Sequence, residues 1–251
     1  LRDFVDKEPV NRAVTGVLAA LGLGWKFSFD AEHVTVINAG VIILLQVAVS
    51  RIVRERRPLP TMVAGMALGA LGFLCLAAST NAWVFVLGIA VFSIGEMTAH
   101  PKYYSFVGLV APKDRVAVYM GYAFLYGVFG SLLGSNLGAL MYETMLKPAI
   151  GTPGAAGRAR LFWGLFALLD VAATAGLLLF ARAFGQDTEA TRRKAARVMV
   201  GVYAAVLLLG ALFLAAAFSG PTLQAKTAVQ AAIFLALGAA GIAVSARRRR
   251  A

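Results

Sequence analysis

The chain alternates long apolar stretches with short polar or basic ones, a pattern typical of proteins that cross a membrane several times. A crossing takes about 20 residues, and several stretches reach or approach that length. They are residues 34–53, 61–79, 83–108, 117–141, 161–181, 198–218 and 224–245. Residues 13–29 are apolar but shorter and contain glycines, which favours an interfacial helix or a packed loop. We therefore expect an all-α, polytopic bundle of transmembrane helices.

Basic residues gather between the apolar stretches and predict the orientation of the chain. Basic runs occur at residues 51–57, 113–115, 182–197 and 247–250, which fall on every second loop of the predicted bundle. Cytoplasmic loops carry an excess of Lys and Arg, so this alternation predicts a multi-pass protein of the cell (inner) membrane with a cytoplasmic C-terminus. The loop at 143–160 carries three basic residues on the opposite side and weakens the pattern locally.

Composition agrees with a membrane protein and excludes several other classes. Apolar residues make up 60% of the chain and charged residues 14%, against about 45–50% and 25% in soluble domains. The net charge of +12 would suggest nucleic-acid binding in a soluble protein, but here no basic stripe accompanies a soluble recognition fold. Cys75 is the single cysteine, so no intramolecular disulfide can form.

The same boundaries predict four regions along the chain. Residues 1–33 form a loop and interfacial segment, residues 34–184 five spans, residues 185–197 a charged cytoplasmic linker, and residues 198–251 two additional helices with a basic tail.

Ionisable residues inside the third predicted span are the first functional candidates. Glu96 and His100 stand near its middle, where a charged side chain costs roughly 2.5–3.5 kcal/mol on insertion scales. Helical spacing places Glu96, His100 and Tyr103 on one face, together with Ser93. Pro101 should interrupt the backbone hydrogen bonds of this helix. The alternative for Glu96 is a structural hydrogen bond to His100 or to a neighbouring helix.

Other polar side chains in the spans leave two readings open. Tyr103, Tyr104, Tyr122 and Tyr126 can line a cavity or sit at the membrane interface. Asn38 can face a pathway or join helices. Asp170, near the centre of the fifth span, can serve transport or a structural contact with the last two helices.

Glycines repeat at four-residue intervals in two spans, which predicts close packing of helices. They are Gly65 and Gly69 in one span, and Gly130, Gly134 and Gly138 in another.

Short motifs in order along the chain resemble the proton-dependent oligopeptide transporters of the major facilitator superfamily. The motifs resembling the tenth and eleventh helices of that family are Gly95-Glu96 with Pro101, Ala111-Pro112, Met120-Gly121 and Gly130-Ser131-Leu132-Leu133-Gly134. Those resembling its eighth and ninth helices are Ile37-Asn38 with Ile42-Ile43, Arg57-Pro58-Leu59-Pro60 and Gly69-Ala70-Leu71-Gly72-Phe73. The similarity covers about residues 34–184, and the chain departs from the family pattern at Ala39, Ala123 and Ser131.

The resemblance implies the C-terminal half of a major facilitator fold, with two extra helices at the C-terminus. It also implies a secondary active transporter in which Glu96 binds substrate and couples protons. The expected partners are a small-molecule substrate, peptide-like by resemblance, protons, the lipid bilayer and a missing N-terminal half of the transporter.

Two other functions remain open, an exporter of drugs or metabolites from the same superfamily and a non-transporting membrane scaffold. An enzyme is not expected, because no nucleophile elbow, paired His-x-x-x-His, cysteine cluster or phosphate loop occurs. No cofactor is expected. No metal is expected either, since two histidines, His33 and His100, are too few for a histidine-rich site.

Overall fold

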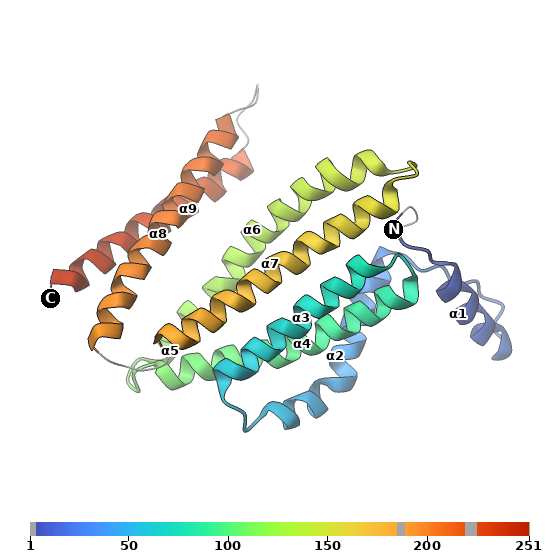
Figure 1. Cartoon of the computed structure of the whole chain (residues 1–251), viewed down its shortest axis with the longest axis horizontal. Coiled ribbons are helices and arrows are strands. Elements are labelled where there is room, and N and C mark those ends of the chain that lie inside the picture. Colours follow the sequence, from blue (N-terminus) through green and yellow to red (C-terminus); the bar gives the residue numbers. More distant parts are fainter. Residues whose placement is uncertain (1–3, 185–188, 219–224, 251) are drawn as a thin grey trace. The chain divides into compact units, whose positions relative to one another are not determined.

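The protein is built from helices, as the sequence predicts. The computed structural model describes residues 4–184, 189–218 and 225–250 (Figure 1). Its helices are α1 (Glu8–Ala20), α2 (Ala31–Val53), α3 (Pro58–Ala78), α4 (Ala82–Val110), α5 (Val116–Ala123), α6 (Leu125–Met141), a π-helix η1 (Tyr142–Leu146), a 3₁₀ turn η2 (Lys147–Ala149), α7 (Ala155–Phe184), α8 (Glu189–Phe218) and α9 (Ala225–Arg250). The chain forms two compact units, Leu1–Leu179 and Phe180–Ala251, and each is described by itself.

The predicted spans correspond to helices, with differences in several places. Among the described residues, six helical stretches are long and apolar enough to cross a membrane, whereas the apolar part of α9, Thr227–Ala243, is shorter. Helix α8 begins at Glu189, inside the predicted charged linker, of which residues 185–188 lie outside the described residues. The apolar segment 13–29 is divided, because α1 ends at Ala20 and Gly22 follows with a φ of 77°.

Helices α3 and α4 touch through their main chains. A Cβ atom added to Gly95 of α4 would lie 2.5 Å from the carbonyl oxygen of Gly65 and 2.7 Å from the amide nitrogen of Gly69, both in α3. Nearer the other end of the pair, a Cβ on Gly72 would lie 2.8 Å from the Gly88 carbonyl oxygen. Small residues permit this approach between membrane helices. The prediction that Gly65 and Gly69 form a packing surface is therefore confirmed.

Aromatic side chains hold α7 beside this pair. Trp163 packs edge-to-face on Phe85 of α4, with ring centroids 5.7 Å apart, and Phe166 lies 5.8 Å from Phe73 of α3. Such ring pairs add about 0.5–1.5 kcal/mol beyond their buried area. Figure 1 shows α7 running beside α3 and α4, and Trp163 of α7 packs against a core cluster that includes Leu76 of α3 and Phe85 of α4.

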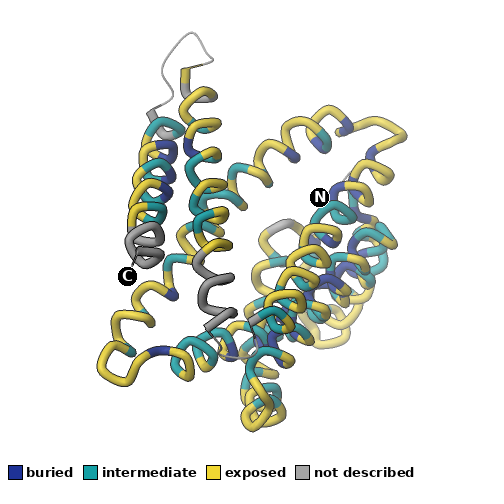
Figure 2. The backbone as a smooth tube through the Cα atoms, turned by 60° about the vertical axis from the view of Figure 1, so that its left-hand side comes forward, coloured by how far each residue is buried: buried dark blue, intermediate teal, exposed yellow. Residues whose placement is uncertain are grey.

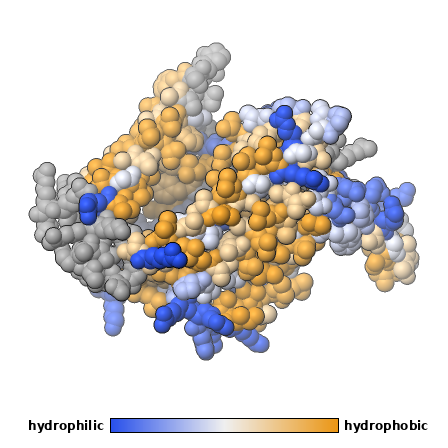
Figure 3. Space-filling view, viewed as in Figure 1, coloured by the Kyte–Doolittle hydropathy of each residue, from blue (hydrophilic) through white to orange (hydrophobic). Residues whose placement is uncertain are grey.

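Helices α2 and α6 expose most of their side chains (Figure 2). Ile43 and Leu44 of α2 are 77% and 80% exposed. Added Cβ atoms at Gly130, Gly134 and Gly138 of α6 would meet nothing within 4 Å, so the packing predicted for these glycines is not formed in the structure. Apolar side chains cover much of the surface in Figure 3, as expected for helices that face lipid.

The second unit contains an antiparallel hairpin of α8 and α9. Leu235 fills the space beside Gly210, and Leu207 fills the space beside Gly238. These contacts pair residues that ascend in one helix with residues that descend in the other. Gln230 is buried in the hairpin, and its Oε1 atom has no hydrogen-bond partner among the described residues.

We predict that Gly95→Ala destabilises the first unit. The new methyl group would overlap main-chain atoms of α3, which cannot rotate away, so the helices must separate. Overpacking of this kind costs about 1–3 kcal/mol. Unfolding of the purified protein in detergent measures the change.

The matched control is Gly134→Ala on α6, where the same methyl group meets nothing within 4 Å. Its stability should equal or exceed that of the parent. Equal losses in both variants would contradict the main-chain contact between α3 and α4.

Candidate functional site

A break in one predicted span positions the candidate site. The stretch predicted as one helix over 117–141 is divided, since α5 ends at Ala123 and α6 begins at Leu125. The Gly127 amide donates to the Phe124 carbonyl at 3.1 Å, a spacing of three residues instead of four. The hydroxyl of Tyr103 in α4 donates to the Ala123 carbonyl at 3.2 Å. A side chain of α4 therefore satisfies a carbonyl at the helix break.

His100 and three tyrosines gather at this break, and we call them the tyrosine cluster: His100, Tyr103, Tyr104 and Tyr126. His100 Nδ1 lies 2.7 Å from the Tyr126 hydroxyl, which is hydrogen-bond distance. The rings of Tyr103 and Tyr126 pack edge-to-face with centroids 4.9 Å apart, and those of His100 and Tyr104 with centroids 5.1 Å apart. The structure thus brings together three predicted site residues, His100, Tyr103 and Tyr126, and places Tyr104 beside them.

Glu96 lies midway along α4, one turn before His100, with its side chain exposed. Among the described residues, no hydrogen bond or ion pair reaches its carboxylate, and His100 bonds to Tyr126 instead. The structural bond between Glu96 and His100 that was the alternative is therefore absent from the described contacts.

Pro101 lies inside α4, which continues to Val110. The expected interruption does not end the helix. Ser105, one turn later, donates its hydroxyl to the Pro101 carbonyl at 3.1 Å.

Asn38 and Tyr122 lie outside the tyrosine cluster. The Oδ1 atom of Asn38 in α2 accepts a hydrogen bond of 2.5 Å from Ser93 Oγ in α4, and Ser93 is fully buried. This contact joins two helices, which is one of the two readings of Asn38. Tyr122 of α5 is 68% exposed. The roles of both residues in transport stay predictions.

Asp170 lies midway along α7, and its carboxyl contacts α3. A Cβ atom added to Gly69 would lie 2.7 Å from Asp170 Oδ2. Its neighbour is therefore the glycine face of α3.

Lys102 is a buried cation that the sequence reasoning missed. Its side chain is 6% exposed, and its Nζ atom donates to the carbonyl oxygens of Arg54 at 2.9 Å and Arg56 at 2.8 Å. These carbonyls follow the end of α2, where unpaired carbonyls attract a cation. Lys102 therefore ties α4 to the loop between α2 and α3. A lysine directly after the proline of an apolar span was the signal available.

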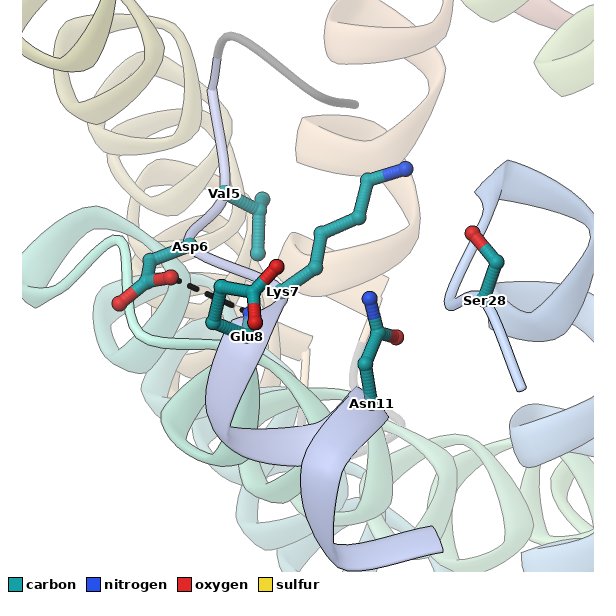
Figure 4. A pocket seen from close by; sticks show the side chains of 6 residues that line it. All are labelled: Val5, Asp6, Lys7, Glu8, Asn11 and Ser28. Carbon is teal, nitrogen blue, oxygen red and sulfur yellow. Dashed lines mark hydrogen bonds between the residues drawn. The ribbon is translucent and has the colours of Figure 1, made fainter. Parts of the chain in front are cut away.

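A polar cavity of about 450 Å³ lies at the N-terminal segment, away from the site (Figure 4). It is lined by Val5, Asp6, Lys7, Glu8, Asn11 and Ser28. Beside it, Lys7 donates to Asp30 at 2.7 Å, and this hydrogen bond lowers the pKa of the Asp30 carboxyl below 3.8. A lowered pKa stabilises the fold at neutral pH, and that contribution is lost as the pH falls through the folded value.

Chain segments around this cavity are joined by backbone hydrogen bonds. Asp6 pairs with the turn between α3 and α4, because its amide donates to Thr80 and its carbonyl accepts from Ala82. Asn11 of α1 accepts from the Phe29 amide at 2.7 Å. The cavity is thus part of the connection between α1 and the spans.

The described residues contain no group of three or more His, Cys, Asp or Glu side chains that could hold a metal ion.

Comparison with known protein families indicates the class of protein to which the chain is similar. Residues 13–135 match the model of the Major Facilitator Superfamily. With the six apolar helices, this match supports a multi-pass membrane transporter. No curated protein and no solved structure matches the chain.

The matched region contains α2 to α5 and most of α6. Glu96 and the tyrosine cluster therefore fall inside the part of the chain that resembles a major facilitator, whereas Asp170 lies beyond it.

We predict that Lys102→Met opens the loop between α2 and α3. A hydrogen bond from a charged group contributes about 1.5–3 kcal/mol, so a loss of about 2 kcal/mol would raise the open population roughly thirty-fold. Trypsin digestion of the purified protein after Arg54 and Arg56 measures this opening.

Lys113→Met is the control, because Lys113 is exposed in the loop after α4. Its digestion at the same arginines should match that of the parent. Unchanged cleavage in Lys102→Met would show that the two hydrogen bonds do not hold the loop.

Proposed function

We propose that the chain forms part of a proton-coupled transporter that carries a small, peptide-like solute by alternating access. The observation that carries this proposal is the exposed carboxylate of Glu96 at the midpoint of α4, one turn from His100 and the tyrosine cluster. Ionisable residues at this depth usually mark a substrate or ion path. A scaffold would need no such group.

The chemistry of Glu96 suits coupling. A carboxyl group can gain a proton on the side of the membrane where protons are abundant and release it on the other. A transporter that changes conformation with its solute only while Glu96 is protonated would therefore couple inward proton movement to inward movement of the solute. The tyrosine rings beside it offer apolar faces with hydroxyl groups at their rims, which suit a small solute with both polar and apolar parts.

The arrangement of helices suits alternating access. The break at Phe124 interrupts α5 and α6 at the level of the tyrosine cluster, and interrupted helices are common at transporter binding sites. The α3–α4 pair, in contrast, is joined through main-chain contacts and would move as one body. In this proposal the other half of the transporter supplies the opposite wall of the solute path. The C-terminus lies on the cytoplasmic side of the inner membrane.

We expect Glu96→Gln to abolish uptake driven by a proton gradient. The amide is neutral and keeps the shape of a protonated carboxyl, so it cannot exchange a proton. Reconstituted vesicles with an inward proton gradient and radiolabelled dialanine as probe measure uptake. Exchange of dialanine at equal pH on both sides should persist, because exchange needs no net proton movement.

Glu143→Gln is the matched control, since Glu143 pairs with Lys147 at 2.6 Å near the end of its helix and away from the cluster. It should retain gradient-driven uptake. Gradient-driven uptake by Glu96→Gln at the parent rate would contradict the proposed role of Glu96 in proton coupling.

A further inference from the structure

The carboxyl of Asp170 occupies a space beside α3 that is open because residue 69 is a glycine. Its Oδ2 atom lies 2.7 Å from the position a Cβ atom would take on Gly69, so any larger residue there would displace the carboxyl. The ring of Phe92 in α4 borders the same position at 3.9 Å. The carboxyl therefore contacts α3 beside α4, at the junction of three helices.

No charge among the described residues compensates this carboxyl. The described ion pairs are Lys7–Asp30, Asp114–Arg115 and Glu143–Lys147, which all lie elsewhere. Thr174, on the same helix, donates to the backbone carbonyl of Asp170 and not to its side chain. At the Gly69 position, the side chain beside the carboxyl is the ring of Phe92. The next titratable side chain along α4 is Glu96.

Asp170 and Glu96 both lie in the middle part of their helices. Each lies at the midpoint of its helix, and Gly69 lies near the midpoint of α3. Phe92 precedes Glu96 by one helical turn, about 6 Å along the axis. Gly95, next to Glu96, contacts Gly69 through the main chain. Asp170 therefore approaches α4 near Phe92, about one helical turn before Glu96 in that helix.

We propose that Asp170 is a second proton-binding carboxyl of the transport path, set one turn from Glu96 toward the end of the bundle where α4 begins. An uncompensated carboxylate in the middle of a span is costly, so protonation of Asp170 stabilises its side chain in the position against Gly69. The proton released by Asp170 would then pass to the carboxylate of Glu96. One O–H bond breaks, another forms, and no other bond changes. The inference rests on the proposed function.

Infrared difference spectroscopy tests proton binding without any substrate. Spectra of the purified, reconstituted protein at acid and alkaline pH show carbonyl bands of carboxyls that gain a proton. We expect Asp170→Asn to remove one such band that Glu96→Gln leaves in place. A spectrum identical to the parent would overturn the proposal.

Gly69→Ala provides a second variant that keeps the carboxyl. This variant displaces the carboxyl of Asp170, because the new methyl group occupies the space of Oδ2. We therefore expect the Asp170 band to shift in frequency. Gly134→Ala on α6, which meets no atom within 4 Å, should leave the spectrum unchanged. An unshifted band in Gly69→Ala would show that the contact with Gly69 does not affect the Asp170 carboxyl.

Dialanine uptake then separates the two proposals. Asp170→Asn should alter the pH profile of gradient-driven uptake and retain exchange at equal pH. A parent-like profile, with uptake lost only in Glu96→Gln, would overturn the role of Asp170 and leave that of Glu96. A parent-like profile in both variants would overturn both.

Discussion

The contact between the main chains of α3 and α4 is the constraint on which the first unit depends. Glycines at the crossing bring Gly95 against Gly65 and Gly69. This proximity fixes the face that α4 turns to α3, and it leaves the side chains of Glu96 and His100 exposed on another face. Because this contact prevents α4 from rotating, it determines where the candidate site lies.

Polar contacts add precision to this packing. Tyr103 reaches a carbonyl at the break between α5 and α6, and Lys102 reaches two carbonyls after α2. Both side chains belong to the part of α4 that follows Pro101. In a bilayer, backbone groups left without partners are costly, so these side chains allow irregular backbone close to the membrane. A single helix thus organises two of its neighbours.

Much of the fold could be predicted, because apolar length and basic loops follow directly from the demands of a bilayer. The face shared by Glu96, His100 and Tyr103 could also be predicted, since helical spacing determines it. The break at Phe124 could not, because residues 117–141 read as an unbroken apolar span. Asn38 and Lys102 could not be assigned either. Their partners, Ser93 and the carbonyls after α2, lie 55 and more than 40 residues away in sequence.

The bond partners of Lys102 have a consequence for variation in the chain. Both acceptors are backbone carbonyls, which every amino acid supplies. The identities of Arg54 and Arg56 are therefore irrelevant to this contact, and only the path of the loop matters. A redesigned or diverged protein could replace the whole basic loop and keep the link to α4, whereas one change at Lys102 would remove it. The fragility of this link resides in one residue of α4, although the loop is the segment that changes most easily.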